Sequence, residues 1–94
     1  MISKEMKSRI DALKSRFSDL YETVQIGERV CYRLENGGII ALDYMGPYNA
    51  LVIEYAESVE DAKQNRFEDG DLFFIGELDE RSMFNAMIQE ITSQ

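Results

Sequence analysis

The residues best suited to chemistry are the acidic side chains between positions 54 and 80. This segment holds ten of them: Glu54, Glu57, Glu60, Asp61, Glu68, Asp69, Asp71, Glu77, Asp79 and Glu80. Closely spaced carboxylates can bind a cation, act as a general acid and base, or oppose the lysine and arginine side chains of another protein. The spacing of the residues helps to decide between these possibilities.

The spacing does not match a calcium-binding EF-hand loop. Such a loop needs glycine at its sixth position and oxygen ligands at positions one, three, five and twelve. Placing Gly70 at the sixth position puts Phe67 at the third and Gly76 at the twelfth, and neither has a side-chain oxygen. We therefore predict no metal site, and we expect residues 68–71 to form a turn.

Helix termini account for several of the acids. Glu60 and Asp61 fall in the first turn of one predicted helix, and Asp79 and Glu80 begin another, where the helix dipole favours a negative charge by ~0.3–1 kcal/mol. Asp69 suits the predicted turn. The acids that remain are Glu54, Glu57, Glu68, Asp71 and Glu77, and the cations within the segment that could balance them are Lys63 and Arg66. This excess of negative charge needs another explanation.

Catalysis is not expected. The chain has no histidine, which removes Ser-His and Cys-His pairs, histidine metal ligands and the usual general base near pH 7. The six glycines match neither a Walker loop nor a dinucleotide-binding fingerprint. Among eighteen acids a pair of carboxylates can always be found, so such a pair carries no specificity. We predict that the protein is not an enzyme and that it uses no cofactor.

The net charge of −8 is concentrated after the first quarter of the chain. Residues 1–26 carry five cations and four acids, whereas residues 27–94 carry five cations and fourteen acids, a balance of −9. Such a surface repels nucleic acid and anionic lipid and attracts basic proteins. We find no apolar stretch long enough for a membrane span, no signal-peptide pattern and one cysteine, which together predict a cytoplasmic location.

Hydrophobic periodicity predicts a long helix at the start of the chain, over residues 3–25. The apolar residues of this segment recur at intervals of three or four: Ile2, Met6, Ile10, Leu13, Phe17, Leu20 and Val24. The same spacing would serve a heptad seam, but it lasts only about three heptads, so packing on a sheet is the better interpretation.

After Gly27 the period changes to the alternation of β-strands. Strands are predicted over 30–35, 39–44 and 50–56, joined by an Asn36-Gly37 hairpin turn and a turn at 46–49. Three strands in sequence with short turns form an antiparallel meander. Cys31 lies on the strand face opposite Tyr32 and is expected to be partly exposed.

The last third of the chain predicts a short helix, a short strand and a final helix. Ser58 and Asp61 form a capping pattern for a helix over 59–66, and residues 72–75 form an apolar strand. Asp79 caps the last helix, where Leu78 and Met83 form a hydrophobic staple. The fold class is therefore α+β in one domain over 1–94, a three- to four-stranded antiparallel meander packed against the long N-terminal and the C-terminal helix, in the order α-β-β-β-α(short)-β-α.

In size, acidity and lack of catalytic residues, the chain resembles the small anti-CRISPR and anti-restriction inhibitors that phages and mobile elements carry. The resemblance covers overall dimensions and charge, without a family motif. It implies a non-catalytic inhibitor or adaptor whose carboxylates occupy the basic, nucleic-acid-binding groove of a partner protein. The predicted partner-binding residues are Glu54, Glu57, Glu60, Asp61, Glu68, Asp69, Asp71 and Glu77.

Two alternatives remain open. One is a small structural or regulatory homodimer, such as an immunity-type or chaperone-like module, formed through the first helix or a strand edge. In that case the acids serve solubility. The other is a small-ligand pocket between the sheet and the helices, which a chain of 94 residues rarely leaves room for.

Overall fold

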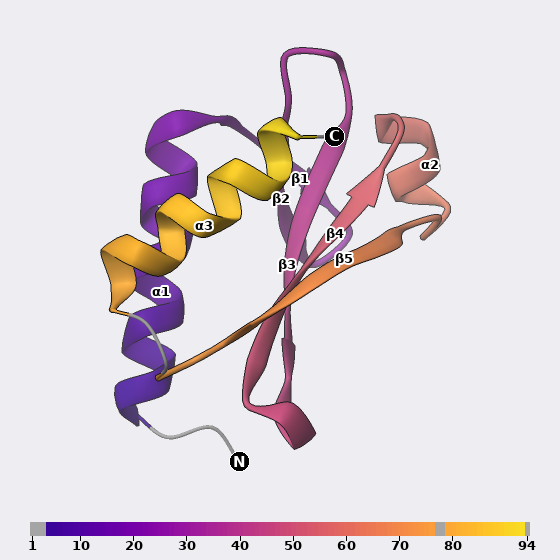
Figure 1. Ribbon diagram of the computed structural model, residues 1–94. Coiled ribbons are helices and arrows are strands. Elements are labelled where there is room, and N and C mark those ends of the chain that lie inside the picture. The colour runs from indigo at the N-terminus through magenta and orange to yellow at the C-terminus, as the bar shows by residue number, and fades with distance from the viewer. Residues whose placement is uncertain (1–3, 77–78, 94) are drawn as a thin grey trace.

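The computed structural model describes residues 4–76 and 79–93, which form an arrangement of helices and strands (Figure 1). The elements are α1 (Lys4–Leu20), β1 (Glu22–Ile26), β2 (Arg29–Arg33), β3 (Ile39–Met45), the short 3-10 helix η1 (Gly46–Tyr48), β4 (Ala50–Ala56), α2 (Val59–Lys63), β5 (Glu68–Phe74) and α3 (Glu80–Thr92). None of the helices in these two ranges is long and apolar enough to span a bilayer.

The strands form one antiparallel sheet in which neighbours in sequence are neighbours in space. Over the described residues the sheet has five strands in the order β1-β2-β3-β4-β5. The predicted α+β class and the antiparallel meander are confirmed. The predicted number of three to four strands is too low, because the predicted first helix includes most of β1.

The first helix ends at Leu20, five residues earlier than predicted. Residues 22–26 instead pair with β2, with Val24 opposite Cys31 and Ile26 opposite Arg29. Gly27 adopts a φ of 61°, which permits a two-residue hairpin turn at this point. Val24 continues the apolar spacing of the helix, so the periodicity alone extended the helix into a segment whose β-branched side chains pack on a neighbouring strand.

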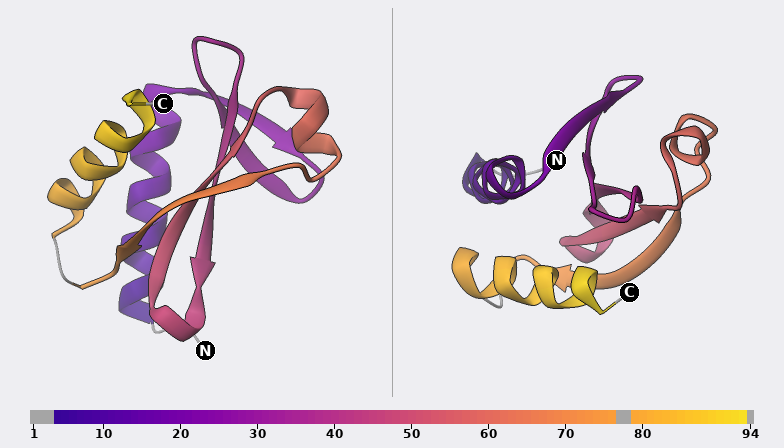
Figure 2. Two further views of the ribbon diagram at one scale, coloured as in Figure 1. Left: turned by 45° about the vertical axis from the view of Figure 1, so that its right-hand side comes forward. Right: turned by 90° about the horizontal axis from the view of Figure 1, so that it is seen from above.

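The two faces of the sheet are covered differently. The larger core lies between one face and the helices α1 and α3, and its buried members are Ile10, Leu13, Phe17, Tyr32, Ile40, Leu51, Ile53, Ile75, Met83, Met87 and Ile91. Figure 2 shows α1 and α3 together on this side and α2 on the other. The apolar stripe of α1 is thus used within the monomer, as predicted for packing on a sheet.

The opposite face carries a smaller core beneath α2. Its buried residues are Cys31, Ile39, Ala41, Ala56 and Ala62, with Val24, Ile26, Val59 and Phe67 packed against them. The expectation that Cys31 is partly exposed is wrong, since its side chain is 0% exposed. Burial also raises the pKa of this thiol, and Cys31 packs as a small residue within this core.

The acidic segment 68–71 is part of a strand and not the predicted turn. Strand β5 begins at Glu68 and pairs with β4, with Tyr55 opposite Glu68 and Glu54 opposite Asp69. The register shifts between Val52 and Glu54, which marks a β-bulge around Gly70. Pairing with β4 therefore overrides the turn tendency of the Asp-Gly-Asp triplet.

Candidate functional site

Local hydrogen bonds define both ends of helix α2. Ser58 caps its start, where the Ser58 Oγ accepts a hydrogen bond from the Asp61 N–H at 3.1 Å. The helix ends at Lys63, before the predicted residue 66. Asn65 adopts a left-handed φ of 58°, and the Arg66 N–H donates to the Asp61 carbonyl at 2.9 Å. This closure turns the chain back toward the sheet, so that β5 starts directly beside α2.

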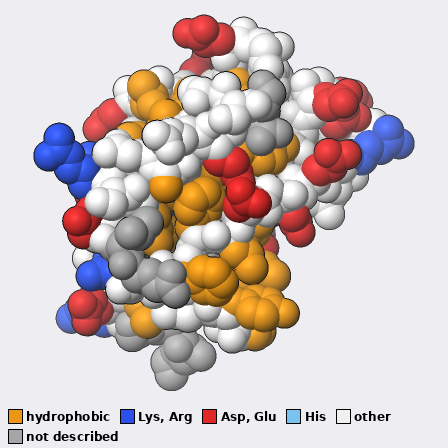
Figure 3. Space-filling view, in the orientation of Figure 1, with side chains coloured by type: hydrophobic (Ala, Val, Ile, Leu, Met, Phe, Trp, Pro, Cys, Tyr) orange, Lys and Arg blue, Asp and Glu red, His pale blue; other side chains and the backbone are white. Residues whose placement is uncertain are grey.

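Five of the eight predicted partner-binding residues gather at this end of the molecule. We call Glu57, Glu60, Asp61, Glu68 and Asp69 the acidic ridge. Four of the five are exposed and Asp61 is half-buried. Arg66 approaches Asp61 at 3.8 Å and is itself largely exposed, so this ion pair is weak. Figure 3 shows acidic side chains crowded over the end that carries α2.

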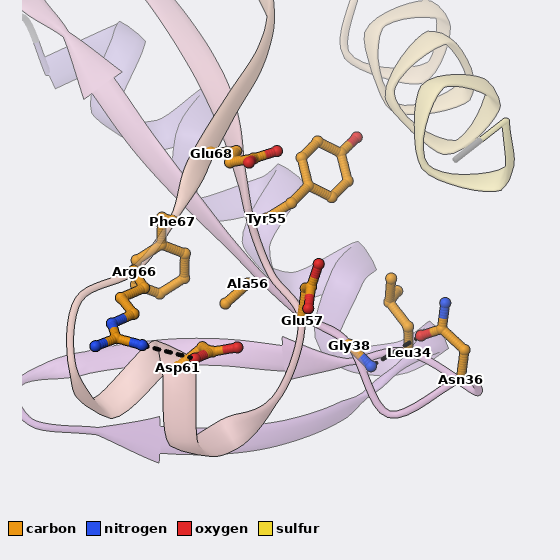
Figure 4. A pocket seen from close by; sticks show the side chains of 10 residues that line it. All are labelled: Leu34, Asn36, Gly38, Tyr55, Ala56, Glu57, Asp61, Arg66, Phe67 and Glu68. Carbon is orange, nitrogen blue, oxygen red and sulfur yellow. Dashed lines mark hydrogen bonds and ion pairs between the residues drawn. The ribbon is translucent and has the colours of Figure 1, made fainter.

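Part of the acidic ridge borders a groove between α2, the start of β5 and the loop after β2. The groove has a volume of about 480 Å³ and is lined by Leu34, Asn36, Gly38, Tyr55, Ala56, Glu57, Asp61, Arg66, Phe67 and Glu68 (Figure 4). Three carboxylates and one guanidinium give it a negative character. It is therefore suited to a cationic side chain of another molecule.

Glu54 is not counted in the acidic ridge because its carboxylate forms an ion pair within the protein. Its carboxylate accepts a hydrogen bond from the Arg29 guanidinium at 2.7 Å, and its side chain is only 14% exposed. Burial alone would lower the pKa of Arg29, but the hydrogen bond and the charge of Glu54 raise it overall. Arg29 also lies over the Phe67 ring, 5.2 Å from its centroid. Glu54 thus stabilises the fold behind the groove and is not free to meet a partner.

Asp71 is not part of the acidic ridge. Asp71 is exposed but lies further along β5, and Glu77, like Leu78 of the predicted staple, falls outside the described residues. Asp79 caps α3 as predicted, since its carboxylate accepts a hydrogen bond from the Ser82 N–H at 2.7 Å. This hydrogen bond lowers the pKa of Asp79.

A cluster around Glu90 has no signature in the amino-acid sequence. The Glu90 carboxylate accepts hydrogen bonds from the Tyr55 hydroxyl and, at 2.5 Å, from the Asp71 N–H. It therefore joins α3 to β4 and to the bulged part of β5. The partners are 35 and 19 residues away from Glu90 in the chain, so no local pattern could have revealed the cluster.

The stability of the protein is expected to fall at alkaline pH through Tyr55. Burial, followed by the hydrogen bond to Glu90 and its charge, raises the pKa of Tyr55 well above its ordinary value of 10.0. The folded state therefore favours the neutral phenol, and this contribution is complete below pH 10 and declines as the pH rises above it. Urea denaturation between pH 8 and 11 measures the decline, which should be smaller in Tyr55→Phe. An equal decline in both proteins would contradict the prediction.

A second groove is larger but has a mixed character. It has a volume of about 830 Å³ and lies between the C-terminal ends of α1 and α3 and residues 33–36. Leu20 and Ile88 line it together with Glu22, Arg33 and Glu35, so charges of both signs border an apolar floor. The acidic ridge, with charge mainly of one sign, is the better candidate site.

The arrangement of the acids would suit an extended cationic surface better than a single metal ion. Among the described residues, no group of three or more Asp, Glu, Cys or His side chains could hold a metal ion. The carboxylates of the acidic ridge are spread over the residue that follows β4, helix α2 and the start of β5. No family model, curated protein or solved structure matches the chain.

Proposed function

We propose that this protein is a non-catalytic inhibitor or adaptor that binds the basic, nucleic-acid-binding groove of a partner protein through its acidic ridge. The observation that carries the proposal is the gathering of five carboxylates, from α2, the residue that follows β4 and the start of β5, at one end of the molecule. Residues 57–71 contain six acids and two cations, a net charge of −4. Capping explains only part of this excess, because Glu57, Glu68 and Asp69 lie outside α2.

The physical basis is charge mimicry. Exposed carboxylates take the place of phosphates opposite lysine and arginine side chains, and the field of the whole acidic surface steers the two proteins together. Steering of this kind raises association rates by about 10–10³-fold at low salt and is screened at high salt. The inhibitor thus acts by occupying the groove and needs no catalytic residue.

The experiment is DNA binding by a panel of purified CRISPR nuclease complexes and restriction enzymes, titrated with this protein. The test variant neutralises four exposed ridge acids: Glu57→Gln, Glu60→Gln, Glu68→Gln and Asp69→Asn. The matched control neutralises the four acids of residues 1–26: Glu5→Gln, Asp11→Asn, Asp19→Asn and Glu22→Gln. Both variants have the same net charge, −4, so they separate the position of the acids from their number.

We expect the wild-type protein to displace DNA from at least one enzyme of the panel. The ridge variant should bind that enzyme at least about fourfold more weakly, since four exposed ion pairs contribute about 0.2–1 kcal/mol each. The control should lose only a small part of the affinity. Equal losses in both variants would show that overall charge, and not the ridge, is responsible.

The competing interpretation is a homodimer in which the acids serve solubility. The stripe of α1 cannot supply this interface without unfolding the core, because Ile10, Leu13 and Phe17 are buried in the monomer. Exposed apolar residues on β5 leave a strand-edge dimer as the remaining form of this alternative. Analytical ultracentrifugation of the wild-type protein distinguishes it from the inhibitor.

A further inference from the structure

Strand β5 presents an open edge at its C-terminal half. It pairs with β4 on one side, and over the described residues no strand pairs with it on the other. The Ile75 N–H donates to the Asn49 carbonyl at 3.0 Å. Because bonded and non-bonded pairs alternate in an antiparallel ladder, the N–H and C=O groups of Leu72 and Phe74 face away from β4. These groups can form the ladder of an additional strand.

The side chains along β5 divide it into two chemically different halves. Leu72 and Phe74 are 38% and 42% exposed and lie on the same face of the sheet. Glu68, Asp69 and Asp71 precede them and are all exposed. Figure 3 shows hydrophobic side chains at the surface on the side that carries β5 and the β3–β4 hairpin. The edge is therefore acidic at its start and apolar at its end.

We propose that β5 binds an extended segment of the basic partner protein as an added antiparallel strand. This inference rests on the proposed function and specifies how the partner is held. Main-chain hydrogen bonds to Leu72 and Phe74 provide the pairing, and alternate side chains of the segment contact these two residues. In antiparallel order, the first half of the segment is apolar with alternating side chains and the second half carries lysine or arginine opposite the acids of β5.

Charge complementarity favours a basic segment over a second copy of this chain. Each copy carries a net charge of −8, and pairing through β5 would bring two sets of the same acids into one interface. The other sheet edge is a poorer candidate, because the exposed residues of β1 are Glu22, Thr23 and Gln25. Strand β5, in contrast, has two exposed apolar residues that directly follow a group of acids.

The Glu90 cluster limits where main-chain pairing along the open edge of β5 can begin. The Asp71 N–H already donates to the Glu90 carboxylate, so the bulged part of β5 is bonded to α3. New main-chain pairing therefore begins at Leu72, while the acids before it interact through their side chains. The added strand is expected to be short, and the charges are expected to contribute much of its affinity.

The probe is a nine-residue peptide with valine at positions two and four, lysine at positions six and eight, and threonine elsewhere. It is titrated into the isotopically labelled wild-type protein, and amide chemical shifts are followed by NMR. We expect the largest shifts at residues 72–74, with weaker binding of the peptide that has the reversed order and of one with glutamate in place of lysine. Shifts outside β5, or equal binding of the three peptides, would overturn the proposal.

Two substitutions at one position test the main-chain pairing. Leu72→Pro removes the outward N–H, which an edge strand tolerates because that group makes no bond to β4. Leu72→Thr alters the side chain but retains the N–H. We expect the proline variant to bind the peptide at least about fivefold more weakly than the threonine variant, in line with the loss of one hydrogen bond. Equal binding would overturn the proposal, and thermal melts verify that both variants fold.

The same variants separate this inference from the proposed function. If the panel enzymes release DNA and respond to the ridge variant but not to Leu72→Pro, the inhibitor function stands and the β5 proposal fails. If the peptide binds β5 while no panel enzyme responds, the strand-addition site stands and the inhibitor function fails. Dimerisation that Leu72→Pro abolishes would identify a second copy as the occupant and overturn the basic-segment proposal.

Discussion

Replacing Phe17 with alanine is expected to lower the free energy of unfolding by about 3–5 kcal/mol. The Phe17 side chain is 0% exposed. Its ring centroid lies 5.5 Å from that of Tyr32 and 5.3 Å from that of Phe84, so it joins α1, β2 and α3. A domain of this size has a total stability of about 5–15 kcal/mol, so the loss is a large fraction of it.

Urea denaturation followed by circular dichroism measures the effect of Phe17→Ala. The matched control is Leu20→Ala on the same helix, where the side chain is 55% exposed. The control should change stability by less than about 1 kcal/mol, since little apolar surface is removed from the core. A loss below about 1.5 kcal/mol in Phe17→Ala would show that the contact between α1, β2 and α3 is looser than described.

Gly70→Ala is expected to destabilise the protein by about 1–3 kcal/mol through overpacking. A Cβ at this position would lie 2.8 Å from Tyr55 Cε2 and 2.8 Å from Glu90 Oε2. Glu90 cannot move away without weakening its hydrogen bonds to Tyr55 and to the Asp71 N–H. The glycine therefore lets α3 approach the bulge in β5 closely.

A double-mutant cycle tests this explanation. Glu90→Ala removes the carboxylate that the new Cβ would meet, so Gly70→Ala should cost less in that background. Gly46→Ala is the matched control, since its Cβ would make only an ordinary contact of 3.7 Å with the Tyr44 ring. Additive effects of Gly70→Ala and Glu90→Ala, or an equal loss in Gly46→Ala, would contradict the role assigned to Gly70.

The Glu90 cluster also connects the core with the candidate binding surface. It attaches α3 to β5, and β5 carries Glu68 and Asp69 of the acidic ridge as well as the open edge. A variant that loosens this connection should therefore affect stability and partner binding together. The ridge substitutions, which lie on exposed side chains, should affect binding with little change in stability.

The elements with local signals can be predicted from the amino-acid sequence. The apolar stripe over Ile10, Leu13 and Phe17 predicted the body of α1, and alternation together with turn residues predicted β2, β3 and β4. The capping residues Ser58 and Asp79 marked the starts of α2 and α3. These signals depend on neighbours a few residues apart, so they are readable without the rest of the chain.

Other features depend on residues that are distant in the chain and become evident when the segments pack together. Residues 22–26 form a strand because β2 offers them hydrogen bonds and an apolar surface, although Val24 also continues the helical spacing. Residues 68–71 extend because β4 pairs with them.

The candidate site also depends partly on local composition and partly on contacts between distant segments. The negative charge after residue 27 was evident from composition, and so was the excess of acids between 54 and 80. Glu54 does not contribute to that surface, because it pairs with Arg29, which lies 25 residues earlier in the chain. Composition thus determines how much charge the surface carries, whereas the packing of distant segments determines which carboxylates remain free to meet a partner.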